Sequence, residues 1–212
     1  MGADEAPAHR PDHYPMPQEE LRARLASKSV AILGCGGLGS NCAGMLVRAG
    51  VPRLTLVDFD EVEADNLNRQ MFFTDQVGTP KVDALASTLL RIDSGIELRL
   101  IRECIDEENL EGMVIGADVI VEAVDGAETK ALIVNVCSRD VPQTPIVSAS
   151  GLAGHASANS IRTIQLADQL WVAGDLESDA WHGHALVASR VMVVAAHQAH
   201  AVIRILLGAE PV

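Results

Sequence analysis

Mostly apolar runs alternate with amphipathic segments along this chain, and that alternation is typical of an α/β fold. Apolar runs at 30–33, 54–57, 118–124 and 145–150 predict buried parallel strands, and a partly alternating run predicts another at 96–101. Apolar positions at helical spacing predict helices at 18–27, 40–49, 81–92, 107–113, 127–139 and 185–207. Segments 159–166 and 170–173 predict a hairpin. We expect a mostly parallel sheet with helices on both faces, extended by antiparallel strands near the carboxyl end.

The first 17 residues lack this periodicity and are rich in Pro, Ala, Asp and His. Such a composition buries little apolar surface, so we expect residues 1–17 to form a flexible amino-terminal arm. Residues 18–212 carry all the predicted elements and are expected to form a single nucleotide-binding domain of ordinary size.

A glycine-rich loop joins the first predicted strand to the next helix. It satisfies the pattern G-x-G-x-x-G and comprises Gly34, Gly36, Gly37, Leu38 and Gly39. Glycines permit the tight turn, and the unpaired N–H groups at the helix start favour a phosphate. Asp58 follows the next strand, where a carboxylate can accept hydrogen bonds from ribose hydroxyls. This order of elements predicts a Rossmann-like nucleotide site.

Polar side chains follow the other predicted strand ends. Arg69 is flanked by amide side chains, a combination suited to phosphate oxygens. Lys81 lies in the first turn of helix 81–92, where a cation opposes the helix dipole, and this misfit indicates an anion held there. Asp125 follows strand 118–124 and could hold Mg²⁺ against phosphates. A solvated arginine, a surface lysine and a helix cap are the alternative interpretations of these three residues.

Charge and hydropathy restrict the functions open to the chain. The formal net charge of −13 disfavours general nucleic-acid binding, although a few cations and a metal ion can neutralise one nucleotide locally. No apolar run is long enough to cross a bilayer, and no signal segment opens the chain. We therefore expect a cytoplasmic protein with neither a membrane nor a nucleic-acid partner.

Cysteines and histidines give weak evidence for a metal. Without a C-x-x-C pair we expect no zinc, and we expect buried, reduced thiols at Cys35, Cys42, Cys104 and Cys137. No acidic or thiol ligand is spaced with the histidines at positions 182, 184, 197 and 200, so packed or interface histidines are favoured over metal ligands.

The glycine loop and Asp58 alone are compatible with an NAD(P)-dependent oxidoreductase or with an ATP-using enzyme. An oxidoreductase needs a proton-handling group near the nicotinamide, and no His or Lys/Tyr pair is placed for that role. Two cations and a metal carboxylate match a triphosphate better. The pattern G-x-x-x-x-G-K-[ST] is absent from the sequence, which excludes a P-loop enzyme.

These motifs together resemble the ThiF/MoeB/HesA family of ubiquitin-activating-enzyme-like adenylyltransferases. The resemblance covers about residues 21–208, and the run Asp-Asn-Leu-Asn-Arg-Gln at 65–70 is its most specific part. Segments 122–130, 149–154, 159–161 and 190–200 are similar to the short, second type of ThiF, which adenylates the sulfur carrier protein of thiamine synthesis.

The resemblance implies a role for each motif. Arg69, Lys81 and Asp125 would be catalytic, the first two by stabilising phosphate charge and Asp125 by binding Mg²⁺. The residues implied to bind ATP are Gly34, Gly36, Gly37, Leu38, Gly39, Asp58, Asp60, Asn66, Arg69, Gln70 and Lys81. The Gly-Gly carboxylate of a small ubiquitin-like sulfur carrier would attack the α-phosphorus, and pyrophosphate would leave. A carboxylate nucleophile is already ionised, so alignment and charge neutralisation suffice without a general base.

The sequence departs from longer family members in several ways. The zinc cysteine pairs are missing, and the amino-terminal arginine signature is reduced to Arg22 and Arg24. No cysteine is evidently placed for a sulfur-transfer step, so we expect adenylation alone. A homodimer is implied, with the carrier tail running along segment 151–155 or 174–183. The alternatives are a carrier for molybdopterin or cysteine synthesis, an NAD(P) oxidoreductase, or a non-catalytic nucleotide- or carrier-binding module.

Overall fold

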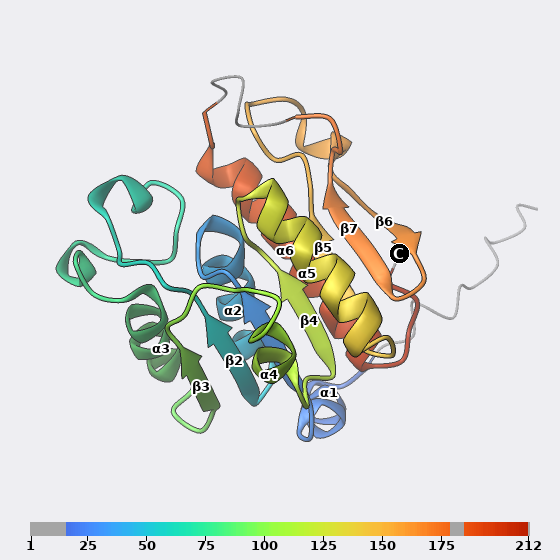
Figure 1. Ribbon diagram of the computed structural model, residues 1–212. Helices are drawn as coiled ribbons and strands as arrows, with labels where there is room; N and C mark the ends of the chain where they lie inside the picture. The colour runs from blue at the N-terminus through green and yellow to red at the C-terminus, as the bar shows by residue number, and fades with distance from the viewer. Residues whose placement is uncertain (1–15, 179–184, 212) are drawn as a thin grey trace, which may run out of the picture.

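The computed structural model describes residues 16–178 and 185–211, and its centre is a seven-stranded sheet of order β3-β2-β1-β4-β5-β7-β6 (Figure 1). The paired strands run parallel throughout, except that β6 is antiparallel to β7. The strands are β1 (Ser29–Leu33), β2 (Arg53–Val57), β3 (Glu97–Ile101), β4 (Val119–Glu122), β5 (Ile146–Ala149), β6 (Arg162–Ala167) and β7 (Leu170–Gly174). The predicted Rossmann-like fold and its carboxyl-terminal hairpin are confirmed, and of the hairpin only β6 runs against the sheet.

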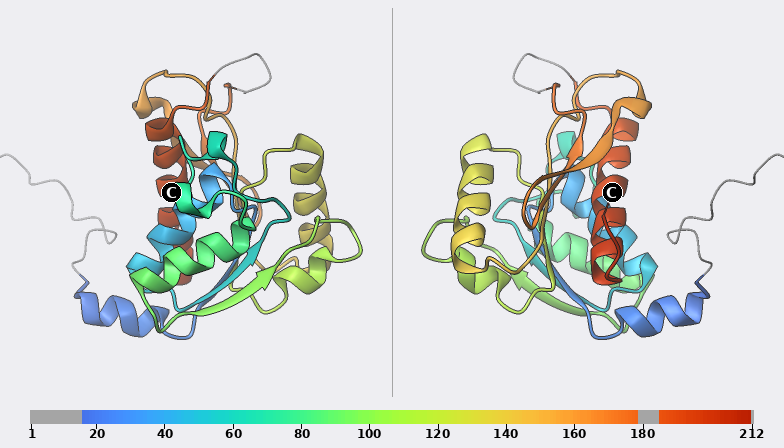
Figure 2. Two further views of the ribbon diagram at one scale, coloured as in Figure 1. Left: turned by 90° about the vertical axis from the view of Figure 1, so that its left-hand side faces the viewer. Right: turned by 90° about the vertical axis from the view of Figure 1, so that its right-hand side faces the viewer.

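Helices cover both faces of the sheet, as expected (Figure 2). One face carries α2 (Gly37–Ala49), α3 (Lys81–Ile92) and α6 (Ala188–Leu206), and the other carries α4 (Leu110–Val114) and α5 (Ala127–Asp140). Helix α1 (Gln18–Leu25) lies near the edge where the parallel strands begin (Figure 1). Arg22 and Arg24 on α1 are therefore remote from the strand ends that carry the predicted site. The expected arm at 1–17 lies almost entirely outside the described residues.

The central strands β1, β4 and β5 are largely apolar and buried because both of their faces are covered. Val30 and Ile32 of β1 pack in the core beneath α2, α3 and α6, while Ala31 and Leu33 pack in a second core beneath α4 and α5. Side chains alternate between the two faces of a strand, so each face needs its own apolar set. This accounts for the continuous apolar runs in the sequence.

Several helix boundaries differ from those predicted. Helix α2 begins at Gly37 rather than residue 40, because the end of the glycine loop is already its first turn. It ends, as expected, at Gly50, whose positive φ lets its N–H bond to the carbonyls of Leu46 and Val47. Helix α6 begins at Ala188 rather than residue 185, because the Ala185 carbonyl bonds to the Gly154 amide outside the helix. The start of the predicted strand 159–166 is instead a 3-10 helix, Ala158–Ser160.

A buried ion pair ties the start of α6 to the segments that follow β5 and β7. The Arg190 guanidinium pairs with Asp175, just beyond β7, and also donates to the carbonyls of Ala156 and Ser157 at 2.9 and 3.0 Å. Both side chains are largely shielded from solvent. Three pieces of chain that are distant in the sequence are thereby held together at the rim of the sheet.

We expect Asp175→Asn to be less stable than the wild type above pH ~4, with a difference that shrinks on acidification. Burial acts to raise the pKa of Asp175, but hydrogen bonds from Ser178, Glu177 and Arg190 outweigh burial and lower this pKa to about 2. Because this pKa is below the ~3.9 of an unfolded aspartate, the folded state binds the proton more weakly. The stabilisation is complete above the unfolded pKa and is lost as the pH falls through about 2. Urea unfolding of both proteins across this range tests the prediction, and a pH-independent difference contradicts it.

Candidate nucleotide site

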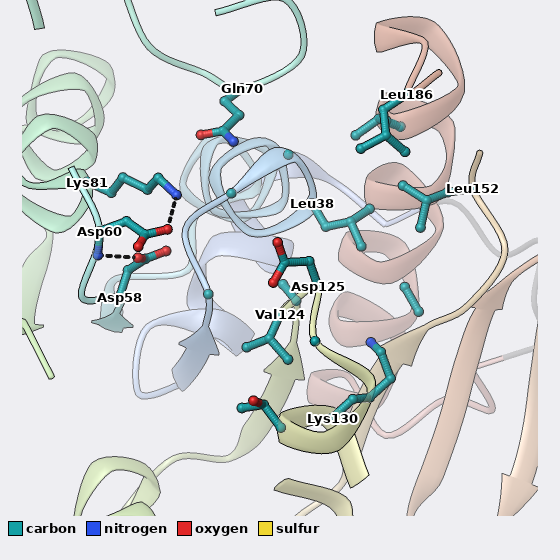
Figure 3. Close-up of a pocket in the computed structure, with 18 of the residues that line it drawn as sticks. Leu38, Asp58, Asp60, Gln70, Lys81, Val124, Asp125, Lys130, Leu152 and Leu186 are labelled. Atoms are coloured by element: carbon teal, nitrogen blue, oxygen red, sulfur yellow. Dashed lines mark hydrogen bonds and ion pairs between the residues drawn. The ribbon is translucent and has the colours of Figure 1, made fainter. Parts of the chain in front are cut away.

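A cavity of about 560 Å³ opens at the carboxyl ends of β1, β2, β4 and β5. The strand order reverses here, since β1 has β2 on one side and β4 on the other, and ligands of open α/β sheets bind at such points. Ten of the predicted site residues line this cavity: Gly34, Gly36, Gly37, Leu38, Asp58, Asp60, Arg69, Gln70, Lys81 and Asp125. In Figure 3 the labelled leucines lie on one side of it and the Asp58–Asp60–Lys81 group on the other, with Asp125 between them.

Close packing determines the shape of the glycine loop. Gly34 has φ +95°, and a Cβ at this position would lie 2.7 Å from the Ala123 carbonyl oxygen. A Cβ at Gly39 would lie only 1.8 Å from the carbonyl oxygen of Gly34, so Gly39 lets α2 start directly against the loop. Gly39 does not line the cavity. The loop therefore presents the amino terminus of α2 to the cavity. The first turn of α2 contains no acidic side chain that would compete with a bound anion for the free N–H groups.

Asp58 is held in a fixed orientation against the glycine loop. Its Oδ2 accepts a hydrogen bond from the Cys35 amide at 2.7 Å, and its Oδ1 accepts one from the Asp60 amide at 2.9 Å. Burial raises the pKa of this carboxyl group above its usual value, while the two amides act in the opposite direction. Each oxygen retains a lone pair, so the carboxylate can still accept hydrogen bonds from ligand hydroxyls.

Lys81 is almost fully buried and its Nζ lies 2.6 Å from Oδ2 of Asp60. The anion expected beside this lysine is therefore supplied in part by the chain itself. Asp60 is about half exposed, and Lys81 still lines the cavity. A bound phosphate would find a lysine already oriented, because an ammonium group has three donors and Asp60 uses one of them.

Some side chains of the stretch 65–70 line the cavity, and others form hydrogen bonds within their own loop. The Arg69 guanidinium donates to the Asp65 carbonyl at 3.1 Å and to Oδ1 of Asn68 at 2.8 Å, which holds it along that loop. Oδ1 of Asn66 accepts from the Glu63 amide at 3.2 Å, and Asn66 does not line the cavity. The predicted contact between Asn66 and a phosphate therefore has no support from the position of this side chain, and it stays a prediction.

Gln70 is only 9% exposed, and its Oε1 has no hydrogen-bond partner among the described residues. A buried polar atom without a partner costs about 1–3 kcal/mol, so such atoms usually meet a ligand or an ordered water. Its side chain lies over the glycine loop, with Nε2 3.8 Å from the Cβ position of Gly36 (Figure 3). Gln70 thus keeps an unused acceptor beside the glycine loop, which only a donor such as a ligand hydroxyl or an ordered water can satisfy.

Asp125 follows the end of β4 and is exposed to the cavity. Within 16–178 and 185–211 no residue donates a hydrogen bond to its carboxylate or forms an ion pair with it. Mg²⁺ in nucleotide sites binds to one or two carboxylates and completes its octahedron with phosphates and waters, so this single free carboxylate fits such an ion.

The described part of the chain contains no group of three or more His, Cys, Asp or Glu side chains arranged to hold a metal ion. His197 packs beside β6, with Nδ1 3.1 Å from Oγ1 of Thr163, as expected for a packed histidine. Burial, and to a lesser extent the charge of His200, lowers the pKa of His197. His182 and His184 lie outside the described residues. No helix in the described ranges is long and apolar enough to cross a membrane.

Two walls of the cavity were not among the site residues predicted from the sequence, although segment 151–155 of the first wall was named there as a candidate path for the carrier tail. One is apolar and comes from the segment after β5 and the start of α6, where Leu152, Leu186 and Val191 join Leu38. The other comes from the loop after β3 and comprises Glu103, Cys104 and Ile105. Because β3 and β5 are parallel strands of the same sheet, the residues that follow them were detectable as candidates by the same argument that identified Asp125.

The expectation that all four thiols are buried is wrong for Cys104. Cys35, Cys42 and Cys137 are buried, whereas Cys104 is exposed. Burial raises the pKa of the Cys35 thiol well above its usual value, that of Cys42 to about 12 and that of Cys137 to about 11. These three thiols are therefore poor nucleophiles at neutral pH.

We expect iodoacetamide to modify Cys104 in the native protein far faster than the other three cysteines, because the thiolate is the reacting form. ATP should slow this modification, because Cys104 lines the cavity. Peptide mass spectrometry after timed labelling, with Cys104→Ser as the control, measures both effects. Equal labelling with and without saturating ATP would place the nucleotide elsewhere.

The chain is similar in sequence to parts of larger proteins. It is 36% identical over 119 residues to the SAMP-activating enzyme E1 of Haloferax volcanii, which is 56% of this chain and 44% of that protein. It is 38% identical over 130 residues to the adenylyltransferase and sulfurtransferase MOCS3 of Mus musculus, which is 61% of this chain and 28% of that protein. The matches thus span less than half of either relative.

Solved structures share its fold. The tRNA N6-threonylcarbamoyladenosine dehydratase TcdA of Escherichia coli, in complex with ATP, superposes with a TM-score of 0.82 over 90% of both chains at 20% identity. Escherichia coli MccB with ATP superposes with a TM-score of 0.72 at 26% identity, over 91% of this chain and 60% of that one.

The profile of the ThiF family matches residues 14–212, which is nearly the whole chain. The match includes the glycine loop, the run 65–70, Lys81 and Asp125, the motifs on which the resemblance rested. It also includes the apolar wall formed after β5. The chain belongs to the ThiF family.

Proposed function

We propose that this protein is an ATP- and Mg²⁺-dependent adenylyltransferase that activates the carboxyl-terminal carboxylate of a small ubiquitin-like carrier protein ending in Gly-Gly. The observation that carries the proposal is one cavity that combines a helix amino terminus, the oriented lysine Lys81 and the free carboxylate of Asp125. These are the groups that a triphosphate and its metal ion require. The names of both sequence relatives, an activating enzyme and an adenylyltransferase, support the same class of activity.

Each group has a distinct task in the proposed reaction. Asp58 holds the ribose, and the amides of the glycine loop hold the phosphates. Mg²⁺ held by Asp125 would neutralise phosphate charge. Arg69 and Lys81 stabilise the charge that builds up on the oxygens around the α-phosphorus and on the departing pyrophosphate.

The carrier's carboxylate oxygen forms a bond to the α-phosphorus while the bond from that phosphorus to the bridging oxygen breaks. The products are an acyl adenylate and pyrophosphate. No proton is transferred in this step, which agrees with a cavity in which none of the described lining residues is a histidine. Proximity and charge neutralisation supply the rate enhancement.

Substituting the three proposed catalytic residues tests the mechanism. We expect Asp125→Asn, Arg69→Ala and Lys81→Met each to lower carrier-dependent pyrophosphate release by about 100-fold or more, because each removes charge stabilisation of the transition state. Arg91→Ala is the control, since it removes an exposed arginine of α3 that does not line the cavity.

Three other results are informative. Unchanged pyrophosphate release in Asp125→Asn would refute its role with Mg²⁺. A wild-type protein that binds ATP and carrier without releasing pyrophosphate would be a binding module. Preference for NADH over ATP would indicate an oxidoreductase.

The finer identity of the carrier is part of the proposal. The similarity of segment 122–130 to the short type of ThiF favours the sulfur carrier of thiamine synthesis, whereas the two relatives are named for SAMP activation and for MOCS3. Pyrophosphate release with a panel of carriers decides between them. The net charge of −13 disfavours a tRNA substrate of the kind named for TcdA, and tRNA belongs in the panel as a negative control.

The apolar wall is the proposed entry for the carrier tail, in keeping with the candidate segment 151–155. The other candidate, 174–183, lies partly outside the described residues. Leu152→Asp should raise the KM for the carrier at least several-fold and leave the KM for ATP unchanged, because the new carboxylate would lose its hydration when the tail covers the wall. Leu90→Asp, at an exposed position on α3, is the matched control. An unaltered carrier KM in Leu152→Asp would exclude this route.

A homodimer and a cytoplasmic location complete the proposal. Four free cysteines are compatible with a reducing compartment. Sedimentation equilibrium tests the dimer, and a monomer at all concentrations would exclude it.

A further inference from the structure

We propose that Glu122 is a positioning residue: its buried carboxylate holds the turn that carries Asp125 in the orientation needed to face the nucleotide and its metal ion. The inference rests on the proposed function. It assigns a task to an acidic residue that does not itself line the cavity.

Glu122 is the last residue of β4 and is 0% exposed. Its Oε1 accepts a hydrogen bond from the Val124 amide at 2.9 Å. Its Oε2 accepts from Lys130 Nζ and from the Ser148 hydroxyl. Its main-chain oxygen accepts from Nε2 of the buried Gln198 at 2.9 Å, which connects the end of β4 to α6. A fully buried carboxylate with this many donors is a rigid anchor.

The bonded groups stand on either side of Asp125. Val124 directly precedes it, and Lys130 is the fourth residue of α5, the helix that starts at Ala127. One carboxylate therefore holds both the approach to the turn and the helix that leaves it. The N-cap residue Gly126 has no side chain with which to cap the helix, so no local cap hydrogen bond orients the turn.

Stability alone is a weak explanation for this arrangement. Replacing a buried ion pair with apolar side chains of similar volume is often neutral or stabilising. Lys130 is also partly exposed and lines the cavity (Figure 3). The pair therefore extends from the core, where Glu122 is fully buried, to the site surface. Residues that orient a metal ligand in this way typically change metal affinity or activity by about 10–100-fold when they are replaced.

The chain offers a matched control at the other end of the same strand. Lys28 pairs with Asp118, immediately before β4, and this pair is also partly buried but lies far from the cavity. Lys130→Met and Lys28→Met therefore each remove one lysine from an acidic partner at one end of β4. Glu122→Gln keeps the size of the side chain but cannot accept from all three donors.

The test compares Glu122→Gln, Lys130→Met and Lys28→Met in three measurements: the Mg²⁺ concentration that half-saturates activity, kcat for pyrophosphate release, and the Kd for ATP without Mg²⁺. We expect the first two variants to need about 10-fold more Mg²⁺ and to lose about 10–100-fold in kcat. Their Kd for ATP without Mg²⁺ should stay within about twofold of the wild type. Lys28→Met should match the wild type in all three measurements.

Two outcomes would overturn the inference. One is a loss of thermal stability in Glu122→Gln and Lys130→Met with unchanged Mg²⁺ dependence and kcat, which is the signature of a purely structural role. The other is an equal loss of ATP affinity with and without Mg²⁺. If Glu122→Gln does not fold, the same three measurements on Lys130→Met decide whether the inference holds. If the wild type releases no pyrophosphate, the adenylation proposal fails, and the effect of Mg²⁺ on ATP affinity in the same variants decides the inference separately.

Discussion

The parallel pairing of β1 with both β2 and β4 is the constraint on which the site depends. In this register Leu33 of β1 lies beside Val57 of β2 and beside Glu122 of β4. The chain therefore leaves the sheet at Gly34, Asp58 and Ala123 at nearly the same level, and the three connections converge on one cavity. A slip of one residue in either pairing would exchange the two faces of the moved strand and take Asp58 or Asp125 away from the glycine loop.

Within this frame the charged groups are largely pre-paired by the chain. Lys81 is paired with Asp60, Lys130 with Glu122, and Asp58 receives two backbone amides. Pre-pairing fixes the orientation of each group before a ligand arrives, which reduces the reorganisation needed during reaction. Two groups at the cavity are left with unused capacity, the carboxylate of Asp125 and the buried Oε1 of Gln70. The first stands where a metal ion would complete the site, and the second is an acceptor that a ligand hydroxyl or an ordered water would satisfy.

Local patterns sufficed to predict most of the fold. Apolar runs identified the strands because both faces of the sheet are covered, and Gly50 marked the end of α2 through a backbone conformation that favours glycine. The start of α6 was misplaced because a tertiary hydrogen bond between Gly154 and Ala185 overrides helix-forming residues. The direction of β7, parallel to β5, likewise depends on a pairing between distant segments.

The same distinction applies to the site. Residues that follow strands were predictable, because parallel strands end at a common edge. The partners of those residues were not, since Lys81 reaches Asp60 and Glu122 reaches Ser148 only after the sheet has formed. Gly39 matched the nucleotide motif, but its place against Gly34 shows a packing role that the motif alone does not distinguish from phosphate contact.

Trapping the acyl adenylate tests the central claim most directly. The protein, ATP, Mg²⁺ and a Gly-Gly carrier are incubated with hydroxylamine, and the carrier is analysed by intact mass spectrometry. Adenylation predicts an ATP-dependent hydroxamate on the carrier's terminal glycine, and a carrier that lacks this glycine should not be modified. A carrier whose mass stays unchanged, despite measurable binding of both ATP and carrier, would contradict the account and leave a binding protein on the same fold.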